Sequence, residues 1–492
     1  MKMSEPARLH PVTIMLTFLK QLKESLIPFL VIFVLGLRDN GLGFPLGIVL
    51  TVLFISSLLL NSFLSWYRFT YRLEDGELRI EYGVFIRKKR YIPFERIQSL
   101  DYSENIFHQL FGLVKISVET AGSEGKQAEA VLAAVTKKEA EAIQKIFQEY
   151  KRTGAAGADE GLSAEAKEET EIYKMSFQEL LIMASTSGGV GVVITAVIAF
   201  LSQFDEWIPY EKWTKEFIAL AANQIFLVSI FLLLGFLLAW IVAVIGMMLK
   251  YAGFTLKKTD KDLIITRGLL EKKQITIPFK RIQGIRISEN IIRQPFRLAT
   301  VHLESAGGSA GESGGSIMIM PLIKKDRIKE TLSPHLQDYQ FIDEFIPAPR
   351  RSLKRYLFRG FVIALPVLTA PVVIFKGWGL LAWLLLPVFL FWFYQKYRDA
   401  GWAVNGDQLS LRYRNIVRYT VYMRRRNIQS LSRQATYFQK RKNLATIRAS
   451  IKSGIGSAGG RVVDLEEKDA AFMYRWFSRT GQKETRERPH GS

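Results

Sequence analysis

The sequence predicts an α+β membrane protein in which three transmembrane helical hairpins (six spans) are each followed by a small β-rich module with a C-terminal helix. The first supporting observation is an internal repeat: residues 92–122, IPFERIQSLDYSENIFHQLFGLVKISVETAG, return at 277–307 as IPFKRIQGIRISENIIRQPFRLATVHLESAG, with 16 of 31 positions identical. A repeat of this length indicates one structural unit made more than once. The second is a long apolar block ahead of each copy, of the kind that crosses a membrane.

A third, divergent copy lies at 423–453, MRRRNIQSLSRQATYFQKRKNLATIRASIKS. It keeps the register at Ile428-Gln429 and at 444–446, but Pro93 and Pro278 of the first two copies become Arg424. Such changes are compatible with the same fold. A surface that the first two copies share would, however, be basic in the third copy. We therefore do not expect the third copy to share every ligand of the others.

The chain divides into eight segments, and the boundaries follow from changes in hydrophobic pattern. They are hairpin 1 at 1–65, β module 1 at 66–152, a linker at 153–175, hairpin 2 at 176–249, β module 2 at 250–341, hairpin 3 at 342–395, a divergent and basic β module 3 at 396–480, and a disordered tail at 481–492. Within each module, alternating strands precede a helix, which is predicted at 137–150, 326–336 and 467–477.

The three hairpins differ in how clearly they can be read. Hairpin 1 is predicted to turn at 38–41, and hairpin 2 to span with 180–201 and 217–249. Hairpin 3, at 357–394, is predicted to turn at 376–379. It contains three prolines, so it could form either two short spans or a re-entrant pair. Small residues at 185–189, STSGG, would permit close approach of helices.

The composition limits which partners the protein can have and in which compartment it can lie. The net charge is +21, which favours an anionic partner, either nucleic acid or the anionic face of a membrane. The apolar blocks favour the membrane; nucleic-acid binding through the basic third module is the weakest alternative. Positive residues flank the spans on the side of the modules, so we expect a multi-pass plasma membrane protein with both termini in the cytoplasm. The absence of cysteine excludes disulfides and thiolate metal sites.

The IPF[EK]RIQ segment, the SENI segment and the strand that ends in [TS]AG resemble the bacterial pleckstrin-homology-like (PH-like) family (DUF304, bPH type 2). Three copies with three hairpins are similar to its UPF0699 group of YdbT-like multi-pass proteins. The resemblance implies PH-like β-barrels or sandwiches that face the cytoplasm and a smaller one-domain PH-like membrane protein (YdbS-like) as partner. It also implies a role in envelope integrity or in resistance to membrane-active peptides such as bacteriocins.

Two sets of polar residues are candidates for a site. The basic residues of the third copy are candidate contacts for anionic lipid, each worth about 1 kcal/mol if it reaches the membrane surface, with a solvated positive face as the alternative: Arg424, Arg425, Arg426, Lys440, Arg441 and Lys442. Four residues repeated in the first two copies form either a recognition surface or, as we favour, structural contacts that include an arginine–glutamate pair: Arg96, Gln98, Arg281 and Gln283.

No catalytic motif appears, the five histidines show no ligand spacing, and we expect neither a cofactor nor a metal. The sequence therefore predicts a non-enzymatic membrane scaffold with three cytoplasmic PH-like modules, which assembles with itself or with the smaller homologue. The alternative is an exporter or lipid-handling protein with a cavity between the hairpins.

Overall fold

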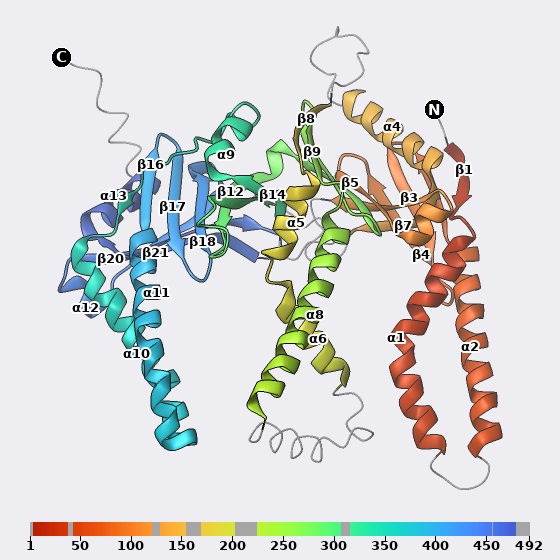
Figure 1. Ribbon diagram of the computed structural model, residues 1–492. Coiled ribbons are helices and arrows are strands. Elements are labelled where there is room, and N and C mark those ends of the chain that lie inside the picture. Colours follow the sequence, from red (N-terminus) through yellow and green to blue (C-terminus); the bar gives the residue numbers. More distant parts are fainter. Residues whose placement is uncertain are drawn as a thin grey trace. The chain divides into compact units, whose positions relative to one another are not determined.

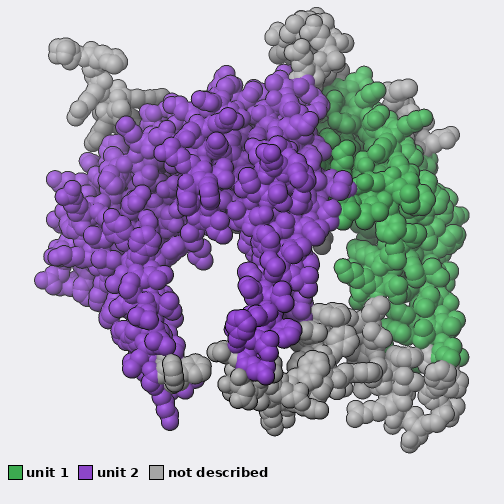
Figure 2. Space-filling model, viewed as in Figure 1, with its two compact units in different colours: residues 1–123, 127–167, 270–276 green, residues 124–126, 168–269, 277–492 purple. Residues whose placement is uncertain are grey.

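A computed structural model describes residues 3–37, 43–120, 128–153, 169–201, 224–306, 315–454 and 456–478. The chain forms two compact units (Figure 2). Unit 1 comprises residues 1–123, 127–167 and 270–276, and unit 2 comprises 124–126, 168–269 and 277–492. Modules 1, 2 and 3 below have the ranges predicted above, and each also includes one strand from the chain ahead of its hairpin.

Unit 1 contains module 1 as two antiparallel sheets (Figure 1). The first sheet has the order β1-β2-β3-β4, with bounds Met3–Arg8, Thr70–Glu74, Glu77–Tyr82 and Lys88–Pro93. The second contains β5 (Ile97–Glu104), β6 (Leu113–Thr120) and β7 (Ala130–Thr136), with the short helix α3 (Ile106–Leu110) after β5. Part of β11 (Lys272–Pro278) belongs to this unit, where residues 272–274 pair with 102–104 of β5.

The predicted alternation explains the core of module 1. Tyr71 and Leu73 of β2, with Leu78 and Ile80 of β3, point inward and are buried. Helix α4 (Lys137–Thr153) closes the module with its apolar face and confirms the predicted helix. Hairpin 1 consists of α1 (Val12–Leu37) and α2 (Gly43–Arg68), which pack together and are each 26 residues long. The predicted turn at 38–41 lies outside the described residues.

Unit 2 joins modules 2 and 3 through one sheet of seven strands, in the order β14-β13-β12-β18-β17-β16-β15. The strands of module 2 are β12 (Ile282–Glu289), β13 (Leu298–Ser305) and β14 (Ser316–Lys324). The others are β15 (Ile346–Pro347), β16 (Gly401–Asn405), β17 (Gln408–Arg414) and β18 (Arg418–Arg424). The second sheet of module 2 and the first sheet of module 3 are therefore continuous.

The remaining elements of unit 2 complete the two modules. Module 2 begins with β8 (Thr170–Lys174), β9 (Thr255–Lys258) and β10 (Asp262–Arg267), and it ends with α9 (Lys325–Leu332). Module 3 ends with β19 (Ile428–Gln434), the short helix α12 (Tyr437–Lys440), β20 (Leu444–Ser453), β21 (Gly456–Glu466) and α13 (Glu467–Phe477). Helix α13 has the predicted bounds.

Each module takes a strand from the chain ahead of its hairpin, which the sequence reading did not anticipate. Strand β1 pairs with β2, β8 with β9, and β15 with β16. The predicted linker at 153–175 therefore ends in a strand, and hairpin 1 begins after one. The described strands form two sheets per module, and closure into a barrel stays a prediction.

The described residues contain four helices long and apolar enough to cross a membrane, or five if one bent pair counts as a span. The four are residues 48–68 of α2, 226–251 of α8 (Ile225–Tyr251), 350–374 with α10 (Leu353–Phe375), and 379–399 with α11 (Leu386–Asp399). The predicted turn at 376–379 opens a 3-10 segment, η4 (Lys376–Leu385).

The predicted span at 180–201 is not one continuous helix. Helix α5 (Phe177–Ser185) ends before α6 (Gly189–Leu201), and the two are bent by 57°. The small polar residues make the break, because Thr186 Oγ1 donates to Ile182 O at 2.7 Å and Ser187 Oγ to Ala184 O at 2.7 Å. Such side chains compete with the helix for backbone groups. The predicted close approach of helices is observed at Gly189 of α6, where an added Cβ would lie 3.4 Å from Ala243 Cβ of α8.

Candidate functional site

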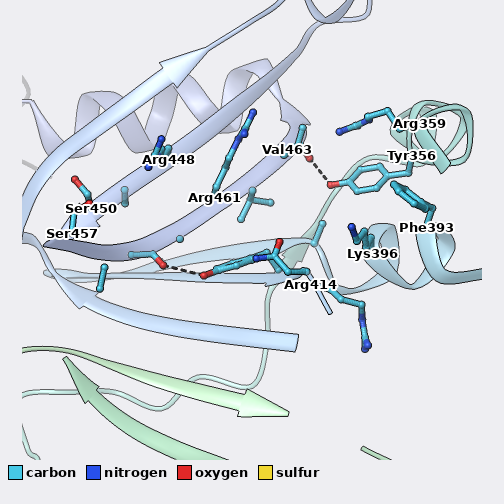
Figure 3. Close-up of a pocket in the computed structure, with 18 residues that line it drawn as sticks. Tyr356, Arg359, Phe393, Lys396, Arg414, Arg448, Ser450, Ser457, Arg461 and Val463 are labelled. Carbon is cyan, nitrogen blue, oxygen red and sulfur yellow. Dashed lines mark hydrogen bonds between the residues drawn. The ribbon is translucent and has the colours of Figure 1, made fainter. Parts of the chain in front are cut away.

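A cavity of about 500 Å³ lies in module 3, where β17, β20 and β21 meet the module ends of α10 and α11 (Figure 3). We call it the basic pocket, because five of its lining side chains are cations. They are Arg359, Lys396, Arg414, Arg448 and Arg461. Among the described lining residues there is no aspartate or glutamate.

The β21 wall of the basic pocket requires glycine. Gly459 has φ +148°, and an added Cβ would lie 2.0 Å from Ala449 O. At Gly460 an added Cβ would lie 3.0 Å from the Tyr413 ring. Tyr413 donates its hydroxyl hydrogen to Gly459 O at 3.0 Å. Burial raises the pKa of Tyr413 to about 12, so this hydroxyl stays protonated at neutral pH. The sequence GSAGG thus brings the strand close to β17.

Arg448 and Arg461 stand directly opposite each other across β20 and β21. Figure 3 shows both on the sheet wall of the basic pocket. Like charges in this position destabilise a sheet. Among the described residues, neither side chain has an acidic partner within ion-pair distance, and a bound anion would relieve the repulsion. Arginine is suited to phosphate because its planar group binds two oxygens at once.

The other cations of the pocket lie toward the membrane hairpin. Lys396 lies over the Phe393 ring of α11, with its nitrogen 4.7 Å from the ring centre. Arg359 of α10 bonds to Asp464, and Arg414 pairs with Asp399 at the end of α11. Arg359 and Arg414 thus each have a carboxylate partner within the fold. Lys396, Arg448 and Arg461 carry the uncompensated positive charge.

Asp464 is fully buried and links the hairpin to the short helix α12. Besides Arg359 it accepts from Arg355 Nε at 3.1 Å, and from Gln439 Nε2 at 2.7 Å. Because Gln439 belongs to α12, this carboxylate fixes α12 beside the first turns of α10.

Gln439 belongs to a feature found in all three modules, which we call the short-helix loops: Asn105–Gly112, Asn290–Arg297 and Thr436–Asn443. Each ends on a residue with positive φ, namely Gly112, Arg297 or Asn443. The fourth position of each loop is a buried polar residue: His108, Arg293 or Gln439. The sequence reading missed this position because the residue type differs in each copy.

The buried polar residue ties each loop to the base of its own hairpin or to a neighbouring strand. His108 Nε2 lies 2.7 Å from Ala133 O of β7, and the next carbonyl, Ala134 O, accepts from His10 N ahead of α1. Arg293 donates to Thr186 Oγ1 at 2.8 Å and to Met183 O at 3.0 Å, at the break between α5 and α6.

The same loops expose apolar side chains next to the buried position. In module 3, Tyr437 and Phe438 are 70% and 67% exposed. Their counterparts in modules 1 and 2 are exposed as well: Ile106, Phe107, Ile291 and Ile292. Aromatic and apolar residues beside a spanning helix are typical of the boundary between lipid and water.

The structure separates the six predicted lipid contacts into two groups. Arg424 pairs with Asp338 at 2.6 Å, Arg426 pairs with the same carboxylate at 2.9 Å, and Arg425 donates to Phe477 O. Strand β18 begins at Arg418, which bonds to Asp399 of α11, and ends at Arg424. A strand of this length places Arg424 roughly 20 Å from the base of the hairpin.

Lys440, Arg441 and Lys442 are exposed and follow Tyr437, Phe438 and the buried Gln439 in the short-helix loop. Among the described residues, none of the three lies within ion-pair distance of a carboxylate. Their place beside α10 suits contact with lipid, whereas Arg424, Arg425 and Arg426 serve the fold.

Of the four repeated residues, Arg96 and Gln98 lie in unit 1, and Arg281 and Gln283 lie in unit 2. Arg96 is exposed and donates its backbone N–H to Pro93 O at 3.0 Å. Gln98 and Arg281 are partly buried, and Gln283 Nε2 donates to Arg281 O at 3.4 Å.

The repeated glutamate of module 2, Glu304, is buried. It pairs with Arg286 at 2.8 Å and accepts from Ser453 Oγ of β20 at 2.9 Å. The arginine beside it is therefore Arg286, a residue that the repeat pattern did not single out. Within the described part of the chain, no three His, Asp or Glu side chains cluster closely enough to hold a metal ion.

Comparisons with known proteins agree with this architecture. The family model described as a bacterial PH domain matches residues 26–151, 193–336 and 360–480. The UPF0699 transmembrane protein YdbT of Bacillus subtilis (strain 168) is 40% identical over 490 residues, which cover 97% of this chain and 99% of that protein. No solved structure matches the chain.

Proposed function

The chain belongs to the bacterial PH domain family and is a membrane protein, and we propose that it is a non-enzymatic multi-pass scaffold that holds anionic lipid head groups at the inner leaflet. Six spans follow if the four long apolar helices are joined by α1 and by the bent pair α5–α6. In this arrangement all three modules and both termini face the cytoplasm.

The observation that carries the proposal is the opposed pair Arg448 and Arg461 in the basic pocket. The pocket opens where module 3 meets α10 and α11, and its lining includes the hydroxyls of Ser450 and Ser457. Arginines and hydroxyls together can bind the phosphate and glycerol oxygens of a phosphatidylglycerol or cardiolipin head group.

The short-helix loops support the same orientation. In module 3 the exposed Tyr437 and Phe438 would enter the boundary region, while Lys440, Arg441 and Lys442 meet the head groups. Each such cation contributes about 1 kcal/mol near an anionic surface. This combination of apolar and basic residues is typical of segments that lie on a membrane.

We extend the proposal to assembly. The continuous sheet of modules 2 and 3 makes a rigid cytoplasmic block that suits a scaffold. The expected partner is a smaller one-domain PH-like membrane protein, with self-assembly as the other route. The expected physiological role is envelope integrity or resistance to membrane-active peptides such as bacteriocins.

The test is affinity capture of the full chain from native membranes, with mass spectrometry of the lipids and proteins retained. Phosphatidylglycerol or cardiolipin should copurify with the wild type and be depleted several-fold in an Arg448→Gln/Arg461→Gln variant. A Lys468→Gln/Arg475→Gln variant removes the same charge from exposed positions on α13 and is the matched control. Equal lipid retention by all three chains would refute lipid binding in the pocket.

The basic pocket also favours a second candidate, a lipid-handling protein or exporter. A pocket beside a hairpin could pass a head group onward instead of holding it. Efflux or transbilayer movement of a labelled lipid or peptide in reconstituted vesicles would support this candidate. If copurified lipid stays in place and nothing is moved, the scaffold is the better account.

A further inference from the structure

The fourth strands of modules 2 and 3 each pair with the module before them. The fourth strands are β4, β11 and β18, which align because Pro93, Pro278 and Arg424 fall at the same point of the repeat. In unit 2, β18 pairs antiparallel with β12, the fifth strand of module 2. In unit 1, residues 272–274 of β11 pair antiparallel with β5, the fifth strand of module 1.

Both pairings place opposite charges across from each other. Lys272 stands opposite Glu104, and Arg418 stands opposite Glu289. Arg418 forms an ion pair with Glu289, whereas Glu104 pairs with Lys137 at 3.1 Å. In each case a cation at the start of the fourth strand faces the glutamate that ends the fifth strand. A cross-strand pair of opposite charge stabilises the register.

Strand β4 has the same chemistry but no strand on its outer edge among the described residues. Arg87 occupies the position of Lys272 and Arg418 in the repeat, and it bonds to Glu81 of its own module at 2.5 Å. Residues 89–91 of β4 are exposed, whereas the corresponding residues 420–422 of the paired β18 are buried.

Basic residues on an edge strand can instead serve to prevent pairing. The chain itself argues against this explanation, because β11 and β18 pair although they begin with Lys272 and Arg418. In this repeat the cation is part of the interface.

We propose that β4 is a docking edge for the fifth strand of a module on a separate chain, a strand that ends in glutamate and pairs antiparallel with β4. Within this chain the two fifth strands that end in glutamate, β5 and β12, are already paired. The third, β19, ends in Gln434 and is followed by Ala435 where the others have glutamate. A second copy therefore lacks a free strand of the required kind. The inference rests on the scaffold role proposed above.

The absence of cysteine in the native chain allows disulfide mapping of this edge. The probe is a synthetic peptide of residues 282–291 with Ser288→Cys, added to the full chain carrying Lys88→Cys in detergent or nanodiscs. Ser288 faces Tyr419 across β12 and β18, and Tyr419 corresponds to Lys88, so the two cysteines should cross-link. A peptide with Gly284→Cys is the offset control.

The expected result is selective cross-linking of the in-register peptide, reduced about five-fold by Glu289→Gln in the peptide or by Arg87→Gln in the chain. Equal cross-linking of the offset peptide, or none of either, would overturn the proposal. A disulfide between chains carrying Lys88→Cys and Gln434→Cys would show self-association through β19 instead. Lipid retention in the same samples reports on the scaffold role separately, because Lys88 lies outside the basic pocket.

Discussion

Arg418 of β18 bonds to Glu289 of β12, and Glu289 is 2% exposed. The same guanidinium reaches Asp399 Oδ1 at the end of α11 at 3.3 Å. Arg418 therefore joins three parts of unit 2: the second sheet of module 2, the first sheet of module 3 and the base of hairpin 3.

We expect Glu289→Gln to lower the melting temperature of the protein in detergent. Removal of one partner from a buried ion pair costs about 3–5 kcal/mol when the other charge is left alone, and the loss here should be smaller because Asp399 still faces Arg418. The exposed Glu330→Gln is the control. A second change, Arg418→Met, should restore part of the loss, because the cation that has lost Glu289 is then gone. A melting temperature unchanged by Glu289→Gln would show that the pair does not hold the sheets together.

Acidification should destabilise module 2 through His302. Burial, followed by the charges of Arg286 and Arg293, lowers the pKa of His302 to about 3. Between pH 6.5 and 3, the unfolded chain therefore binds a proton at His302 that the folded chain does not. The neutral His302 costs no stability above pH 6.5, and the free energy of unfolding decreases as the pH falls below 6.5. At pH 5 the loss is about 2 kcal/mol.

The measurement is the melting temperature from pH 7.5 to 4.5, for the wild type and for His302→Leu. The variant should show a flatter profile. The profile of His335→Leu, which removes another histidine of module 2, is measured for comparison with that of His302→Leu. Parallel profiles for the wild type and His302→Leu would contradict the assignment.

Arg448→Gln should have opposite effects with and without anionic lipid. In neutral detergent it relieves repulsion with Arg461 and should stabilise by about 0.2–1 kcal/mol. With phosphatidylglycerol present, the wild type should gain more stability than the variant, because ligand binding to the folded state raises stability. Both effects are checked by measuring the melting temperature of the two proteins at increasing lipid concentration. An equal rise in melting temperature for the wild type and the variant would refute anion binding at this pair.

Gly459→Ala should destabilise the wall of the basic pocket. The backbone conformation at φ +148° and the contact with Ala449 O both exclude a side chain. Strain of this kind costs about 1–3 kcal/mol. Gly235→Ala in α8 is a matched control, since an added Cβ there meets nothing within 4 Å. Equal melting temperatures for the two variants would contradict the close approach of β21 to β20.

The sequence predicted the features that depend on local pattern. Alternation in 78–82 and helical spacing in 467–477 each correspond to an observed element, β3 and α13. The strands ahead of the hairpins were missed for a physical reason. Strand β1, MSEPAR, has no alternation and contains Pro6, which is tolerated at a sheet edge but argues against a strand when read alone. Its stability comes from pairing with β2, more than 60 residues away.

The candidate site was predictable only in part. Lys440, Arg441 and Lys442 stood out as a basic cluster and do lie beside the hairpin. The Arg424 cluster looked the same in sequence, but its Arg424 and Arg426 pair with Asp338, a residue of module 2 that only the folded chain brings near. The opposed arginines at 448 and 461 depend on the β20–β21 register, which sequence alone does not fix.

The central claim is that the module was copied with its hairpin and that all three modules project into the cytoplasm. The direct test is labelling of single cysteines in intact cells with a membrane-impermeant maleimide, at the exposed positions Lys145, Lys329 and Lys468, one in each module. Cysteines at Arg38 and Lys376, in the predicted turns at 38–41 and 376–379, are the outside controls. We expect all three module positions to stay unlabelled until the cells are permeabilised, while the turn positions react at once. Labelling of any module position in intact cells would contradict the central claim.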